Sequence, residues 1–169
     1  NTRSALHTLI ELNAHAGKPM IMDADALNIM ANEPNLLTRL PANTALTPHP
    51  KEFARLVAHL ECDISNETAQ AQAHTAFAQT YHLIVVLKGA HTRIALPDGR
   101  TFTNTTGNAG MAKGGSGDVL TGIILALLAQ GYTTEIAACI GVYVHGLAGD
   151  IAAEQFGQTA MLPSDLIEC

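Results

Sequence analysis

Charged residues are scarce in this chain, and their scarcity limits what it can bind. Only 14% of the 169 residues are charged, against about 25% in an average soluble domain. Nine Lys and Arg oppose 15 Asp and Glu, which gives a net charge of −6 and leaves no basic stretch. This balance argues against nucleic acid or an anionic membrane surface as a partner. Because 47% of the residues are hydrophobic, we expect oligomerisation or a missing piece of chain.

Cysteines and long apolar runs are also few. Cys62, Cys139 and Cys169 lie far apart and form no C-x-x-C motif, which is typical of reduced thiols in a cytoplasmic protein. The apolar run Val119–Ala129 has 11 residues, whereas a membrane span needs about 20. We find no secretory signal. The first residue is Asn1 rather than Met, so we expect a fragment or a processed product.

One stretch, from Asn104 to Gln130, combines a glycine-rich loop with a long helix. A helix that begins just after such a loop offers unpaired N–H groups and the positive end of its dipole. These features together form an anion site, most often for phosphate. Asp118 lies at the helix start, where a carboxylate could act as a base, contact a metal indirectly or only cap the helix. The glycines of the loop are Gly107, Gly110, Gly114, Gly115 and Gly117.

Short apolar runs alternate with helical patterns along the chain, and the clearest buried strand, over 82–87, is continuous in apolar residues as parallel strands are. In the helix expected over 66–81, we predict that Ala69, Ala73, Ala76, Phe77 and Thr80 face the sheet. The helix over 119–130 is apolar all round, so we expect it to be buried and to pack on the next helix through small residues. With no repeat or linker, we predict one domain over residues 1–169. The other expected helices cover 4–16, 26–31, 51–59 and 133–154, and the strands cover 20–22, 44–47, 82–87, 92–96 and 100–104.

Polar side chains follow two of the predicted strands at their carboxyl ends, where ligands collect in parallel α/β sheets. Asp23 and Asp25 follow the first strand, although either could instead cap the next helix. Lys88 follows the most apolar strand and precedes Gly89. This lysine is suited to a phosphate or a nucleotide, but a solvated lysine in a turn gives the same pattern.

His49 follows the remaining parallel strand and lies between Pro48 and Pro50. The two prolines fix the backbone and remove neighbouring hydrogen-bond donors. The imidazole would then be held rigidly at a strand end. A surface or structural histidine is the alternative.

Four motifs together closely resemble the ADP/ATP-dependent NAD(P)H-hydrate dehydratases, the carboxyl-terminal domain of bifunctional nicotinamide-nucleotide repair proteins. The resemblance runs from about Leu6 to the last residue. It implies a ribokinase-like fold, a three-layer α/β sheet with helices on both faces. The motifs are Asp23-Ala24-Asp25-Ala26-Leu27, Thr47-Pro48-His49-Pro50-x-Glu52-Phe53, Val86-Leu87-Lys88-Gly89-x-x-Thr92 and Gly107-Asn108-x-Gly110-Met111-Ala112-x-Gly114-Gly115-x-Gly117-Asp118-Val119-Leu120.

The resemblance also implies a reaction and a role for each matched residue. The reaction is nucleotide-dependent dehydration of the (S)-hydrate of NADH or NADPH, with ADP or ATP as co-substrate and Mg²⁺. Asp118 would be the catalytic base, and Gly115 and Gly117 would form the anion hole. His49 would contact the hydrate, with Asp23 and Asn28 near its cleft. The nucleotide would bind to Lys88, Gly89, Ala90, His91 and Thr92.

The chain departs from the family pattern in two places. Lys51 stands where the family usually has glycine, and a Gly-rich strand-end motif upstream has no match. We therefore expect an incomplete, C-terminal portion of the domain, as a homo-oligomer or bound to its missing N-terminal segment, and not a stable free monomer. The alternatives are a small-molecule kinase of the same superfamily, acting on a sugar or a vitamin alcohol, and a nucleotide-binding piece without activity.

Overall fold

The computed structural model describes residues 1–169. Residues 21–103 contain a five-stranded sheet with strand order β1-β2-β3-β4-β5. β1, β2 and β3 run parallel, and β4 is antiparallel to β3. Because Ile21 pairs with Ala45, and Ala45 with Ile84, the parallel strands are in register. The predicted α/β class is confirmed. The strands are β1 (Ile21–Met22), β2 (Ala45–Leu46), β3 (Ile84–Leu87), β4 (Arg93–Ala95) and β5 (Thr101–Thr103).

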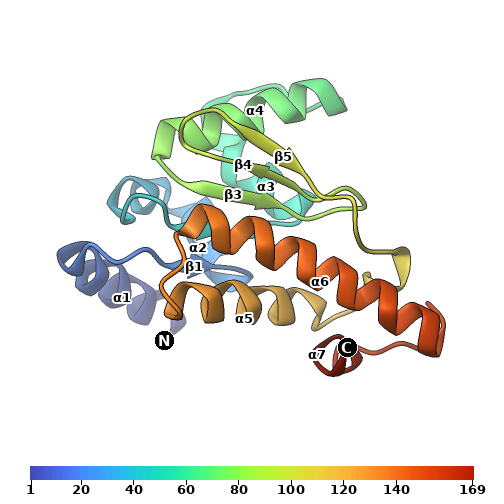
Figure 1. The fold of residues 1–169 in the computed structure, drawn as a ribbon. Helices are drawn as coiled ribbons and strands as arrows, with labels where there is room; N and C mark the ends of the chain where they lie inside the picture. The colour runs from blue at the N-terminus through green and yellow to red at the C-terminus, as the bar shows by residue number, and fades with distance from the viewer. The chain divides into compact units, whose positions relative to one another are not determined.

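The chain forms two compact units (Figure 1). The first unit contains Asn1–Gly89 and Arg93–Phe102, and the second contains Ala90–Thr92 and Thr103–Cys169. The predicted single domain remains a prediction.

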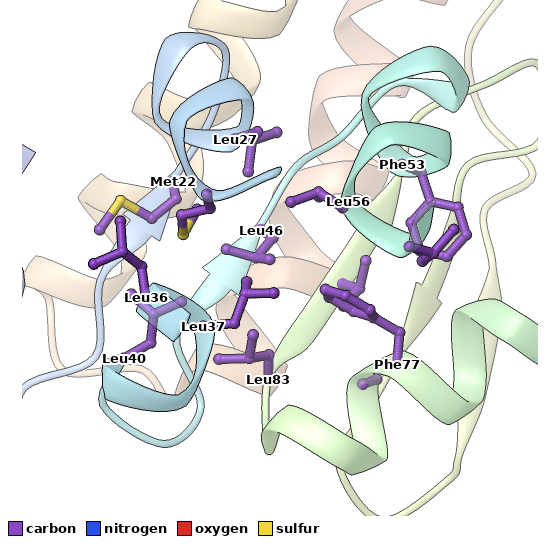
Figure 2. Close-up of a cluster of buried hydrophobic side chains, with 14 of the residues drawn as sticks. Met22, Leu27, Leu36, Leu37, Leu40, Leu46, Phe53, Leu56, Phe77 and Leu83 are labelled. Atoms are coloured by element: carbon purple, nitrogen blue, oxygen red, sulfur yellow. The ribbon is translucent and has the colours of Figure 1, made fainter. Parts of the chain in front are cut away.

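Helices pack on one face of the sheet in the first unit and enclose a hydrophobic core. Leu27, Leu46, Phe53, Phe77 and Leu83 lie at its centre (Figure 2) and are fully buried. The helices are α1 (Thr2–Ala16), α2 (Asp25–Asn32), α3 (Pro50–Val57) and α4 (Glu67–Tyr81), with the 3₁₀ turns η1 (Pro34–Arg39) and η2 (Ala58–Leu60).

Helix α4 presents a different face to the core from the one expected. Ala73 and Phe77 are buried as predicted, but Ala76 and Thr80 are exposed. His74 takes a buried position instead, where its Nε2 atom lies 2.9 Å from the Val85 carbonyl oxygen. The hydrogen bond to that strand carbonyl explains why a polar ring can lie inside the core.

Two apolar helices dominate the second unit, α5 (Ser116–Ala129) and α6 (Thr134–Phe156), and they pack on each other as predicted. A Cβ atom on Gly141 of α6 would lie 2.7 Å from the Ile124 side chain, so the absence of a side chain there permits this close packing. The expectation that α5 is buried all round is wrong. Within its 14 residues only Ser116, Leu120 and Ile124 are buried, and Leu125 is 53% exposed. The unit also contains η3 (Ala109–Met111) and α7 (Asp165–Glu168).

Helix α6 is the one helix long and apolar enough to cross a membrane by length and composition. In its 18-residue window, 44% is buried.

Candidate functional site

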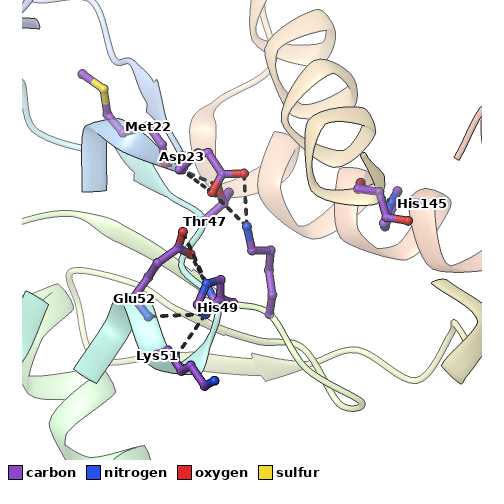
Figure 3. A network of polar contacts seen from close by, with 10 residues as sticks. Met22, Asp23, Thr47, His49, Lys51, Glu52 and His145 are labelled. Atoms are coloured by element: carbon purple, nitrogen blue, oxygen red, sulfur yellow. Dashed lines mark hydrogen bonds and ion pairs between the residues drawn. The ribbon is translucent and has the colours of Figure 1, made fainter. Parts of the chain in front are cut away.

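The carboxyl ends of the three parallel strands lie side by side and are joined by backbone hydrogen bonds. The Thr47 amide donates to the Met22 carbonyl at 3.1 Å, and the Lys88 amide donates to the Pro48 carbonyl at 2.9 Å. The parallel register brings the residues that follow β1, β2 and β3 to one edge of the sheet. We call Asp23, His49, Glu52 and Lys88 the strand-end cluster (Figure 3).

Asp23 and Lys88 form an ion pair within this cluster. The Lys88 Nζ atom lies 2.8 Å from Oδ1 and 3.1 Å from Oδ2 of Asp23. The Lys88 side chain is only 23% exposed, and the Asp23 side chain is only 12% exposed. The sequence assigned Lys88 to the nucleotide and Asp23 to the substrate cleft, whereas the structure brings the two together.

Asp23 also stabilises an unfavourable backbone conformation. Its Oδ1 atom accepts the Ala24 amide at 2.8 Å, and Ala24 has a φ of 51°. Such a conformation costs about 1–3 kcal/mol in a residue other than glycine and is common at functional sites. The alternative that Asp23 or Asp25 caps α2 is wrong, because Ala24 is the N-cap residue and no side chain caps the helix.

Asp25 and Asn28 both lie at the start of α2. Asp25 is exposed and Asn28 is half-buried. Asn28 thus lies in the first turn of α2, and its predicted position near the substrate cleft stays a prediction.

His49 caps α3 with its own ring. Its Nδ1 atom accepts the amides of Lys51 at 3.1 Å and Glu52 at 3.3 Å. In return, Oε2 of Glu52 accepts the His49 amide at 2.7 Å, which completes a capping box. The sequence analysis gave Glu52 no role, although an acidic residue three positions after a cap is the known signal for this arrangement.

The predicted nucleotide segment is divided between the units. Lys88 and Gly89 belong to the first unit, and Ala90–Thr92 belongs to the second. Gly89, Ala90 and His91 are exposed, while the Thr92 carbonyl accepts the Asn104 amide at 2.9 Å. The nucleotide role of these five residues stays a prediction.

The glycine-rich loop, residues 107–115, leads directly into α5. Gly115 is the N-cap residue with a φ of 101°, which only glycine adopts readily. Gly117 and Asp118 follow in the first turn, where backbone N–H groups lack partners within the helix. Asp118 is exposed and is the third residue of α5, so the alternative that it is the N-cap is wrong. The Ser116 hydroxyl is buried without a hydrogen-bond partner.

Two side chains hold the first half of this loop against α6. Asp150 accepts the Gly107 amide at 2.9 Å and the Asn108 side-chain amide at 3.0 Å. Asn108 also donates to the Gly149 carbonyl at 2.8 Å and accepts the Gly110 amide at 3.0 Å. The sequence analysis missed Asp150 because nothing local links it to a loop some 40 positions earlier.

Lys113 holds the second half of the loop. Its ammonium group donates to the carbonyl oxygens of Gln158 at 3.3 Å, Thr159 at 2.8 Å and Met161. An ammonium group has three N–H donors, and these carbonyls engage all of them. Lys113 therefore anchors the 158–161 turn.

Comparison with known proteins identifies the family of this chain. The model of the NAD(P)H-hydrate dehydratase family matches residues 1–169. A bifunctional NAD(P)H-hydrate repair enzyme of Moorella thermoacetica is 46% identical over 94% of this chain and 29% of its own length. An ADP-dependent (S)-NAD(P)H-hydrate dehydratase of Neisseria meningitidis is 44% identical over 95% of this chain and 54% of its own.

A solved structure is similar to this chain in both sequence and fold. The ADP/ATP-dependent NAD(P)H-hydrate dehydratase of Bacillus subtilis, co-crystallised with ATP/Mg²⁺, superposes with a TM-score of 0.71. It is 33% identical over 89% of this chain and 53% of its own length. The predicted ribokinase-like fold is confirmed, and the chain spans about half the length of these two dehydratases. The chain belongs to the NAD(P)H-hydrate dehydratase family.

Proposed function

We propose that this protein restores NADH and NADPH from their (S)-hydrates and uses ADP or ATP as the phosphoryl donor. The observation that carries the proposal is the start of α5. There a carboxylate, Asp118, lies beside unpaired backbone amides on the first turn after a glycine-rich loop. The relatives described as hydrate dehydratases support the reaction.

The chemistry needs a base and an anion hole. Hydroxide is a poor leaving group and phosphate is a good one. Asp118 takes the proton of the substrate hydroxyl. The hydroxyl oxygen bonds to the terminal phosphorus of ADP or ATP, and the bond between that phosphorus and the rest of the nucleotide breaks. Phosphate then leaves with the C–O bond electrons, and the neighbouring ring carbon loses a proton.

Backbone groups meet the charge that develops on the transferred phosphoryl group. The amides of Gly117 and Asp118 and the positive end of the α5 dipole favour an anion there. Preorganised donors of this kind are usually the largest contribution to such catalysis.

The side chains do not form a preassembled Mg²⁺ site. The chain has no group of three or more His, Cys, Asp or Glu residues that could hold a metal ion. Mg²⁺ commonly binds through one or two carboxylates together with substrate phosphates. We infer that any Mg²⁺ arrives with the nucleotide, and we assign it no step.

The strand-end cluster has a binding role in this proposal. His49 contacts the hydrate, Asp23 and Asn28 lie near it, and Lys88 begins the nucleotide segment that continues through Gly89, Ala90, His91 and Thr92. The ion pair between Asp23 and Lys88 means that a change in either residue alters the other.

The oligomeric state is a proposal as well. Several large apolar side chains on α5 and α6 are exposed by 39–53%. Exposed apolar surface of a few hundred Å² or more usually marks an interface. We propose that a second copy or an N-terminal segment covers them. The side chains are Leu125, Ile136, Ile140, Tyr143, Val144 and Leu147.

Product analysis tests the function. The protein is incubated with the (S)-hydrate of NADPH and ADP or ATP, and NADPH, inorganic phosphate and spent nucleotide are measured. We expect the three products in equal amounts. A stable phosphorylated small molecule would instead identify a kinase, and nucleotide binding without turnover would identify an inactive binding piece.

A further inference from the structure

The cap of α3 fixes the chemical state of His49. Ser, Thr, Asp and Asn are the preferred N-cap residues, but here an imidazole nitrogen does the capping. Nδ1 of His49 accepts two backbone amides, from Lys51 at 3.1 Å and from Glu52 at 3.3 Å. A neutral imidazole carries a single proton. Since the Nδ1 lone pair is engaged by donors, these partners assign the proton to Nε2.

Glu52 holds the ring in this state. Its Oε2 atom accepts the His49 amide at 2.7 Å, and its Oε1 atom lies 3.6 Å from Nε2. The Glu52 side chain is 8% exposed, whereas that of His49 is 46% exposed. Glu52 is therefore buried in the protein, whereas the His49 ring is accessible to a ligand.

We propose that Glu52 is a positioning residue that holds His49 as an Nε2–H donor, and that His49 gives this hydrogen bond to an acceptor atom of the nicotinamide-nucleotide substrate. Neither nitrogen is then free to accept a proton from the ligand. The role is recognition and excludes general-base catalysis by His49. The identity of the ligand rests on the proposed function, but the state of the ring does not.

Long-range ¹H–¹⁵N correlation spectra of the ligand-free protein at mildly alkaline pH test the ring state directly. Loss of signals in His49→Asn identifies those of His49 among the eight histidines. We expect one tautomer, protonated on Nε2, in the wild type and in Glu52→Gln, whose amide oxygen can still accept the His49 amide. Glu52→Ala should give a mixture. A mixture in the wild type, or the same spectrum in all three proteins, overturns the proposal.

Binding measurements test the consequence. His49→Asn keeps a capping oxygen, so it should unfold at the wild-type temperature yet bind the NADPH hydrate about 10-fold more weakly, the loss of one hydrogen bond. Glu52→Gln should stay near wild type. Lys51→Ala is the control, because its backbone amide still caps the ring. Wild-type affinity in His49→Asn contradicts the proposal.

Two results separate this proposal from the proposed function. If Glu52→Ala does not fold, the wild-type spectrum still decides the ring state, since a mixture there overturns the proposal, and the binding by His49→Asn decides the recognition role. If the wild type binds no hydrate, the proposed function and the assigned ligand both fail, while the spectra still decide the role of Glu52.

Discussion

The strand-end cluster and the glycine-rich loop handle charge in opposite ways. In the first, charged side chains pair with each other, as in Asp23 with Lys88 at 2.8 Å. In the second, backbone amides at the start of α5 provide the positive potential, and side chains such as Asp150 and Lys113 hold the backbone in place. The cluster therefore places charged side chains at the sheet edge, whereas most polar side chains around the loop hold its backbone in shape.

Asp118, in the first turn of α5 after the loop, is the exception, because we assign it chemistry rather than support. Asp118→Asn keeps the shape but cannot take the proton, and loss of a general base typically lowers kcat about 10²–10⁴-fold. We expect this loss with nucleotide affinity nearly unchanged, measured by steady-state kinetics and calorimetry. An Asn variant with near-normal kcat would remove the distinction between Asp118 and its neighbours.

The first unit should also be the more acid-sensitive, through His74. Burial lowers the pKa of His74 from 6.5 to about 4, and the Val85 carbonyl offsets part of this effect. Above pH 6.5 the ring is neutral in both states. As the pH falls toward 4, the His74 ring takes up a proton in the unfolded chain but stays neutral in the folded one. The free energy of unfolding therefore falls by up to about 3 kcal/mol.

Urea denaturation of the wild type and of His74→Leu at about pH 7 and pH 4.5 checks this prediction. The difference in stability between the two pH values should be smaller in the variant, since the titrating ring is gone. Equal pH dependence in the two proteins would show that His74 does not control acid sensitivity.

Asp150→Ala should damage the loop without touching any ligand. It leaves the Gly107 amide and the Asn108 side chain without their acceptor, at a cost of about 1–3 kcal/mol. We expect lower stability and weaker nucleotide binding. Glu154→Ala, an exposed change one turn later on α6, is the matched control. Wild-type stability in Asp150→Ala would mean that the loop holds its shape without this clamp.

The smallest expected effect lies in the ion pair of the cluster. Asp23→Asn, Lys88→Met and the double variant form a thermodynamic cycle. Because the pair is only partly buried, we expect a coupling energy of about 1 kcal/mol. Lys88→Met alone should weaken ADP or ATP binding more than hydrate binding. Additive effects on stability would show that the two residues act independently.

The strand positions and the residues that follow them were predictable from sequence because their signals are local. A short apolar run marks each parallel strand; Asp23 and Lys88 stand directly after β1 and β3, and His49 follows β2 after Thr47 and Pro48. Helix ends were predictable for a similar reason. The side chain of Asn66 accepts the Ala69 amide at the start of α4, and Thr133 accepts the Ile136 amide at the start of α6.

Contacts between distant positions could not be predicted in this way. Asp23 and Lys88 are 65 positions apart, and Asn108 and Asp150 are 42 apart. The alanine-rich α4 has no clear apolar stripe, so its buried face was assigned partly wrongly at Ala76 and Thr80. The buried face of α5 could not be predicted either, because apolar residues occur on every face of this helix.

Oxygen labelling tests the central claim, that dehydration proceeds through phosphorylation of the hydrate. The (S)-hydrate of NADPH carrying ¹⁸O in its hydroxyl group is turned over with ADP or ATP, and both phosphate and water are analysed by mass spectrometry. The account predicts that the label leaves in inorganic phosphate, because that oxygen bonds to phosphorus before the C–O bond breaks. Label found in water, with unlabelled phosphate, would contradict it.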